Sequence, residues 1–288
     1  MEFLLPAVIA LGGMGIISAI ILYFVSKKFE VQDDPRITEI QALLPSANCG
    51  GCGYPGCSGF AAACTQAASL DGLLCPVGGT ETMNRIATVL GYSAVACEPR
   101  VAVVRCNGSC EKRPHTNQYD GTGNCAIASA LYGGETGCPY GCLGWGDCVT
   151  ACLFDAIRIH PETRLPEVDE TRCTACGACV KACPKQLIEL RRKSSGFHRT
   201  VKPDDADTLH RIYVACMNRD KGGVARKACS AACIGCSKCL KNCESEAIVI
   251  ANNLAYIDDS KCTLCGRCVS ECPTASIVEY LQTKEIVC

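Results

Sequence analysis

The chain has 288 residues, enough for about two ordinary domains of roughly 150 residues each, so a single small module is excluded. Its 28 cysteines contrast with 1 Trp, 6 Phe and 9 Tyr, and so few large side chains point to metal as the main source of stability. Lys and Arg together number 28 against 29 Asp and Glu, and this balance gives no indication of a nucleic-acid partner.

The first segment is apolar and uncharged. From Leu4 to Val25 no residue carries a charge, a length that allows a helix to cross a hydrocarbon layer of roughly 30 Å. A cleaved signal peptide is the alternative, but only Glu2 precedes the run and no A-x-A cleavage site follows it. We therefore predict a transmembrane anchor over residues 1–27. Lys27 and Lys28 place the rest of the chain on the cytoplasmic side, where disulfides are not expected.

Residues 28–90 are predicted to form a small domain around one cysteine group. Cys49, Cys52 and Cys57 lie in a glycine-rich loop, and Cys75 follows 18 residues later. The glycines allow the backbone to turn tightly around an inorganic centre. The stretch 60–70 has the composition of a helix, and Cys64 within it is predicted to be a buried thiol without a ligand role.

Four further cysteine groups belong to one spacing family, in which the group from Cys138 is the divergent member, and they predict two tandem units at residues 95–195 and 205–288. Each group is followed at the same distance by an isoleucine that begins a short apolar strand. The predicted unit is a cysteine loop, a short helix and a strand. The groups are Cys138, Cys142, Cys148, Cys152; Cys173, Cys176, Cys179, Cys183; Cys233, Cys236, Cys239, Cys243; and Cys262, Cys265, Cys268, Cys272.

The two units also align with each other. Cys106 corresponds to Cys216 and Cys138 to Cys229, whereas Trp145 takes the place of Cys236. The first unit has therefore lost one ligand position, and Cys138 is the predicted substitute. Four remaining cysteines recur near the cluster loops and are candidates for a further centre, with buried thiols as the alternative: Cys106, Cys125, Cys216 and Cys229.

The spacing C-x2-C-x2-C-x3-C is that of bacterial ferredoxins, in which the fourth cysteine reaches the other cluster of a pair. Zinc normally uses two separated C-x2-C pairs, which would leave a third cysteine over. Crossing the fourth cysteines predicts at least five [4Fe-4S] clusters with these ligands: Cys49, Cys52, Cys57, Cys75; Cys152, Cys173, Cys176, Cys179; Cys138, Cys142, Cys148, Cys183; Cys243, Cys262, Cys265, Cys268; and Cys233, Cys236, Cys239, Cys272.

Cluster loading changes the charge of the protein. An oxidised cluster with its four thiolates carries a charge of about −2. Five clusters therefore shift the formal net charge of the chain from −1 to about −11. Basic runs then become candidate docking surfaces for an acidic partner. The clearest run is Arg191, Arg192, Lys193, His198, Arg199 and Lys202, for which an ordinary solvated linker is an equal alternative; the next candidates are Arg219, Lys221, Arg226 and Lys227.

No motif for organic catalysis is present. The sequence contains no P-loop, no G-x-S-x-G and no H-E-x-x-H, and the one G-x-G-x-x-A match, at Gly121, follows a polar loop where a dinucleotide site requires a strand. We therefore predict no catalytic residues and expect electron transfer. The predicted fold is α+β, with short hairpins and helices around clusters.

The uncharged N-terminal helix, the NCGGCGYPGC group from Asn48 and the tandem ferredoxin motifs resemble the B subunit of the Rnf complex, the membrane-bound ion-translocating ferredoxin:NAD oxidoreductase. The resemblance implies an electron carrier within a translocase at the bacterial inner membrane. It implies that electrons pass between soluble ferredoxin and the other Rnf subunits while Na+ or H+ is moved. The alternatives are an electron-wire component of a heterodisulfide-reductase-like assembly and a redox regulator of a cluster-containing transcription factor.

Overall fold

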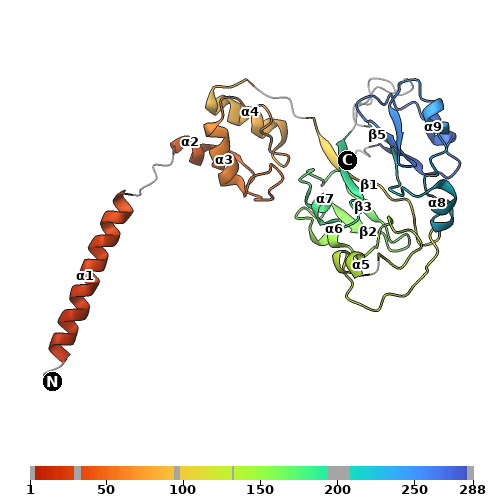
Figure 1. The fold of residues 1–288 in the computed structure, drawn as a ribbon. Coiled ribbons are helices and arrows are strands. Elements are labelled where there is room, and N and C mark those ends of the chain that lie inside the picture. Colours follow the sequence, from red (N-terminus) through yellow and green to blue (C-terminus); the bar gives the residue numbers. More distant parts are fainter. Residues whose placement is uncertain (1–3, 29–33, 94–97, 132, 194–207, 284–288) are drawn as a thin grey trace, which may run out of the picture.

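The protein is represented by a computed structural model that describes residues 4–28, 34–93, 98–131, 133–193 and 208–283. Figure 1 shows an isolated helix, a small helical unit and two mixed units of helices and strands that lie against each other. The mixture of short helices and two-stranded sheets confirms the α+β expectation for the units that carry the cysteine motifs.

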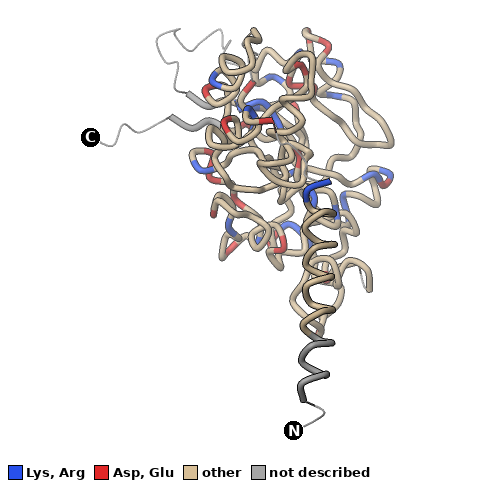
Figure 2. The backbone as a smooth tube through the Cα atoms, turned by 90° about the vertical axis from the view of Figure 1, so that its left-hand side faces the viewer, with Lys and Arg blue, Asp and Glu red and all other residues tan. Residues whose placement is uncertain are grey.

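Helix α1 spans Leu4–Lys28 and stands apart from the other elements (Figure 1). The described large apolar side chains of α1 are exposed, among them Met14 at 63% and Leu22 at 67%. Its charged residues are confined to the C-terminal end, at Lys27 and Lys28 (Figure 2). Within the residues that the structure describes, no helix reaches the length and apolar character needed to cross a membrane, so the predicted transmembrane span is not confirmed.

The small unit consists of helices α2, Pro35–Leu43; α3, Cys57–Gln66; and α4, Gly79–Leu90. Asp34 caps α2 by accepting the backbone N–H of Arg36 at 2.9 Å, with Pro35 in the first turn. Phe60, Met83 and Ile86 fill a core with no more than 1% exposure each. Cys64 is fully buried among them, which confirms its predicted place as a core thiol.

The two larger units repeat one order of seven elements. The first unit contains β1, Arg100–Val104; α5, Cys125–Leu131; α6, Asp147–Thr150; β2, Ile157–Ile159; β3, Pro166–Val168; α7, Ala178–Ala182; and β4, Ile188–Arg192. The second unit contains β5, Thr208–Val214; α8, Gly222–Ala228; α9, Lys238–Lys241; β6, Ile248–Ala251; β7, Leu254–Ile257; α10, Arg267–Ser270; and β8, Ile277–Thr283.

Strand pairing is also the same in both units. β1 pairs antiparallel with β4 and β2 with β3, just as β5 pairs with β8 and β6 with β7. The four predicted isoleucines are the first residues of β2, β4, β6 and β8, so the predicted strand starts are correct.

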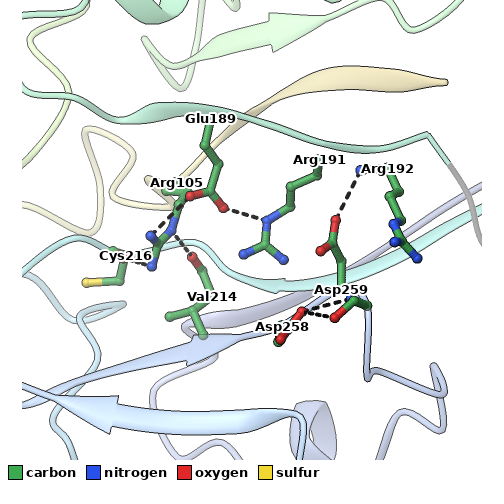
Figure 3. A network of polar contacts seen from close by, with 9 residues as sticks. Arg105, Glu189, Arg191, Arg192, Val214, Cys216, Asp258 and Asp259 are labelled. Atoms are coloured by element: carbon green, nitrogen blue, oxygen red, sulfur yellow. Dashed lines mark hydrogen bonds and ion pairs between the residues drawn. The ribbon is translucent and has the colours of Figure 1, made fainter. Parts of the chain in front are cut away.

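The contact between the two units is polar and partly buried, and it changes the interpretation of the basic run. Arg191 has only 3% side-chain exposure and forms an ion pair with Glu189 (Figure 3). Its guanidinium lies over the rings of Tyr256 and Tyr213, at 5.0 and 5.9 Å from their centroids. Arg192 donates its backbone N–H to Asp259 at 3.1 Å. The expectation that Arg191 faces solvent as a docking residue is therefore wrong, because it joins the two units. His198, Arg199 and Lys202 lie outside the described residues.

Candidate metal centres

All described cysteines are free thiols, and the backbone of the cysteine loops explains how three of them gather. In each of the four ferredoxin-type loops, two residues separated by one have a left-handed backbone, and the second immediately precedes the short helix that follows the loop. Such a backbone turns the chain twice and directs consecutive thiols to one side. The residue pairs are Gly144 and Gly146, Ala175 and Gly177, Gly235 and Ser237, and Leu264 and Gly266.

The cavity of the small unit contains the predicted set Cys49, Cys52, Cys57 and Cys75. Asn48 closes the loop because its Oδ1 accepts the backbone N–H of Cys57 at 2.9 Å. The backbone N–H of Gly78 donates to Cys75 Sγ at 3.3 Å. A hydrogen bond of this kind stabilises a thiolate that binds iron. The cavity therefore has the donor set and the sulfur hydrogen bonding that a [4Fe-4S] cluster requires.

In the second unit, one cavity is lined by Cys233, Cys236, Cys239 and Cys272, which is the crossed set predicted from the spacing. This cavity thus combines three thiols of one loop with the fourth cysteine of the other loop. In the neighbouring loop, burial raises the pKa of Cys268 to about 12, and the nearby thiols Cys262, Cys265, Cys239 and Cys243 contribute to the rise.

In the first unit, Cys173 and Cys176 lie near Cys179, as do thiols of the other loop. Burial raises the pKa of Cys179 to about 12, and Cys173, Cys176, Cys148 and Cys152 raise it further. The last cysteine of each loop in this unit accepts a hydrogen bond from the backbone N–H of the residue four positions later. Ala156 donates to Cys152 Sγ and Leu187 donates to Cys183 Sγ, each at 3.4 Å.

The other set of the first unit differs from the expected one in a single member. Cys142, Cys148 and Cys183 line a cavity together with Cys125, and Cys138 is not among its lining residues. Burial raises the pKa of Cys148 to about 12, and Cys125 and Cys183 are the thiols that add most to this rise. Cys125 therefore occupies the position that was predicted for Cys138.

Between Cys106 and Cys138 the first unit has an insertion that the second unit lacks between Cys216 and Cys229, and this insertion brings Cys125 into position. Asp147 accepts the backbone N–H groups of Cys125 and Ala126 at 2.8 and 3.1 Å, which fixes the start of α5 beside the cysteine loop. Trp145, which replaces a ligand in the sequence alignment, packs edge-to-face on Tyr119 of the insertion with ring centroids 6.2 Å apart. The insertion and Trp145 therefore belong together, a relation that spacing within the motif could not reveal.

Cys138 instead lines a cavity between the two units, together with Cys106, Cys216 and Cys229. Three of the four cysteines that were candidates for a further centre are thus together, and the fourth, Cys125, lies elsewhere. Among the described residues, no three His, Cys, Asp or Glu side chains converge closely enough to hold one metal ion. The cysteine thiols instead line cavities, at the four sites described above.

Comparison with known proteins identifies iron–sulfur domains in these parts of the chain. Residues 137–187 and 232–276 match the family model of the 4Fe-4S dicluster domain, and residues 44–68 match a model described as a putative Fe-S cluster.

Three relatives are similar along nearly the whole chain. The B subunit of the Na(+)-translocating ferredoxin:NAD(+) oxidoreductase complex of Acetobacterium woodii is 43% identical over 94% of this chain and 77% of its own length. The B subunit of the ion-translocating oxidoreductase complex of Methanosarcina acetivorans is 38% identical over 95% of this chain and 97% of its own length. The B subunit of the proton-translocating ferredoxin:NAD(+) oxidoreductase complex of Clostridium ljungdahlii is 38% identical over 92% and 88%.

Proposed function

The chain belongs to the family of B subunits of ion-translocating ferredoxin:NAD oxidoreductase complexes, and from this membership we propose how its cysteines carry electrons through it. As a member it is the iron–sulfur electron-transfer subunit of a complex that couples electron flow to ion translocation. When bound, a [4Fe-4S] cluster accepts and releases one electron at a time. The protein contributes the ligands, their spacing and the exclusion of water.

Five clusters are proposed, four with the predicted ligands and one with Cys125 in place of Cys138. The revised set is Cys125, Cys142, Cys148 and Cys183. The observation that carries the proposal is that thiols of neighbouring sets share one buried core: Cys148 packs in the same core as Cys179, and Cys239 in the same core as Cys268. Sets this close allow an electron to pass within each unit without a further carrier.

Soluble ferredoxin is proposed as the electron donor, and the exposed basic residues at helix α8 as its docking surface. This surface consists of Arg219, Lys221, Arg226 and Lys227. A loaded protein near −11 repels an acidic partner unless a local basic patch offsets the field over the roughly 10 Å within which charges act at 0.1 M salt.

Helix α1 is proposed as the anchor to the membrane, with the cluster units on the cytoplasmic side. The support is its uncharged sequence from Leu4 to Val25, the exposed apolar side chains from Met14 to Val25, and the two lysines at its C-terminal end. The other subunits of the complex are the proposed partners in the membrane.

Stepwise reduction tests the electron-carrier proposal. The anaerobically purified full chain, in detergent, is titrated with reduced ferredoxin while the visible absorption of the clusters is followed. We expect uptake of about one electron for each bound cluster, and a Cys49→Ala variant that takes up one electron fewer. Uptake of no electrons by protein with its full iron content would contradict the proposal.

A further inference from the structure

The cavity between the two ferredoxin-like units has a symmetric set of ligands. Cys106 and Cys138 belong to the first unit, and Cys216 and Cys229 are their counterparts in the second unit. Cys106 and Cys216 each follow the first strand of their unit by two residues. Cys138 and Cys229 each precede the first cysteine of a ferredoxin-type loop by four residues, Cys142 and Cys233. Each unit thus contributes the same two thiols.

From this arrangement we infer that Cys106, Cys138, Cys216 and Cys229 hold a sixth [4Fe-4S] cluster that bridges the two units. The empty space at this site, its opening to solvent included, is about 290 Å³, against about 300 Å³ at the Cys49 site, about 330 Å³ at the Cys233 site and about 400 Å³ at the Cys142 site. The space between these four thiols therefore matches the space at sites whose ligand spacing is that of known clusters.

Hydrogen bonds to the sulfur atoms support thiolate ligands here. The backbone N–H groups of Asn218 and Cys233 donate to Cys216 Sγ at 3.4 and 3.3 Å. The side-chain Nδ2 of Asn218 lies 3.6 Å from Cys138 Sγ, and Asn218 is only 1% exposed. Asn218 thus links a thiol of each unit. A neutral thiol core requires no such donors, whereas cluster sulfurs are commonly stabilised by them.

Positive charge is also built into the site, mainly by Arg113, because Arg105 already forms an ion pair with Glu189 at 3.3 Å. Arg105 and Arg113 line the cavity and are 5% and 4% exposed. Arg105 donates to the carbonyl oxygens of Val214 and Cys216 at 3.2 and 3.4 Å, so it joins the two units at the ligand strand (Figure 3). Arg113 Nε is buried without a hydrogen-bond partner in the described part of the chain. A buried unpaired donor is costly, and an anionic centre in the cavity would stabilise it.

The backbone leaves room for Arg113 at this position. A Cβ on Gly108 would lie 2.7 Å from Arg113 Cδ, and a Cβ on Gly141 would lie 2.6 Å from its Nη1. Glycine at both positions therefore lets the chain enclose the guanidinium group beside the thiols. Such enclosure favours a permanent countercharge to a centre of about −2.

The position of the sixth cluster completes a path. Arg113, which lines the cavity, donates from Nη1 to the carbonyl oxygen of Cys142 in the first unit, and Cys216 accepts a hydrogen bond from the backbone N–H of Cys233 in the second unit. An electron from the cluster at Cys142 can therefore reach the cluster at Cys233 by reducing the bridging cluster, which is oxidised again when it passes the electron on. No bond to carbon forms or breaks. The inference rests on the proposed function and adds the connection between the two units.

Metal analysis of the anaerobically purified full chain tests the sixth site. Iron and acid-labile sulfide should each approach about 24 per chain, against about 20 for five clusters. Cys216→Ala and Cys106→Ala, one from each unit, should each lose about four iron and four sulfide, with the same EPR signal missing in both variants. Cys110→Ala is the matched control, because Cys110 lies in none of the cavities described here, and it should lose none.

The outcomes separate this inference from the function itself. About 20 iron in the wild type, unchanged in Cys216→Ala and Cys106→Ala, would overturn the sixth cluster and leave the five-cluster carrier intact. One zinc per chain in place of four iron would also overturn it. If Cys216→Ala fails to fold, Cys106→Ala and Cys229→Ala address the same site from other elements, and the iron count of the wild type decides independently of all variants.

Discussion

Gly51 of the small unit lies directly against the backbone of Cys176 in the first ferredoxin-like unit. A Cβ on Gly51 would lie 2.8 Å from the carbonyl oxygen and 2.9 Å from the Cα of Cys176. Both residues lie in cysteine loops, so this contact joins the proposed cluster at Cys49 to the one at Cys173. With the bridging site between the two larger units, the contact completes a path from the small unit to the C-terminal unit.

Gly51→Ala tests this contact. The added methyl group must displace the backbone of Cys176 because such short distances to backbone atoms are sterically forbidden. We expect electron transfer from the small unit to the first ferredoxin-like unit to slow several-fold, with unchanged iron content. Rapid-freeze EPR after mixing with reductant measures the transfer. Gly223→Ala is the control, since a Cβ there meets nothing within 4 Å; equal slowing in both variants would contradict a role for the contact.

The position of Cys125, at the site that spacing predicted for Cys138, leads to a second prediction. Cys125→Ala should remove the same EPR signal and about four iron as Cys183→Ala, because both thiols line the cavity of Cys142 and Cys148. Cys138→Ala should remove a different signal. If Cys138→Ala and Cys183→Ala remove the same signal, Cys138 is the ligand that the sequence suggested and the cavity assignment fails.

Iron removal should unfold the cluster units. The hydrophobic cores of these units include many of the cysteines that are proposed to bind iron. Binding of iron and formation of the core are therefore coupled. We expect far-UV circular dichroism of the chelated protein to show loss of the sheet signal and no cooperative melt. The small unit, whose core includes Phe60, Met83 and Ile86, should retain more of its helix signal. A native-like cooperative transition without iron would refute the prediction.

Any structure that survives in the iron-free protein should weaken as the pH rises. Burial raises the pKa of Cys142, Cys148 and Cys216 from 9.0 to about 12. The pKa of each thiol is higher in the folded state than in the unfolded state, so burial of the neutral thiol favours the folded state below about pH 9. This contribution to stability is lost as the pH rises through about 12. The far-UV circular dichroism signal that remains in the chelated protein should be smaller at about pH 10 than at about pH 7; an equal or larger signal at the higher pH would contradict the prediction.

The docking surface at helix α8 gives a charge-reversal test. Replacing Arg226 and Lys227 by Glu should slow the oxidation of reduced ferredoxin severalfold at low salt and weaken its dependence on salt, because steering by opposite charges is lost. Stopped-flow absorption measures the rate. The control replaces Arg158 and Arg172, which are exposed on the first unit, by Glu. Rates that fall equally in both double variants would indicate general repulsion and no docking at α8.

Local spacing alone determined much of this protein. The three-cysteine loops, the crossed positions of Cys183 and Cys272, the strands that begin at Ile157, Ile188, Ile248 and Ile277, and the buried thiol of Cys64 could all be predicted, because each depends on residues close together in sequence or on a repeated pattern. The family could be predicted from the order of the motifs.

The tertiary structure decided what depends on the path of the chain between motifs. The insertion that packs on Trp145 brings Cys125 to a site where spacing favoured Cys138, and the contact of the two units buries Arg191, which composition placed on the surface. The pairing of Cys106 and Cys138 with Cys216 and Cys229 depends on how the two units meet. A sequence motif specifies which thiols share a loop, but a ligand from a distant segment is chosen by packing, since only the folded chain determines which segment fills the remaining space.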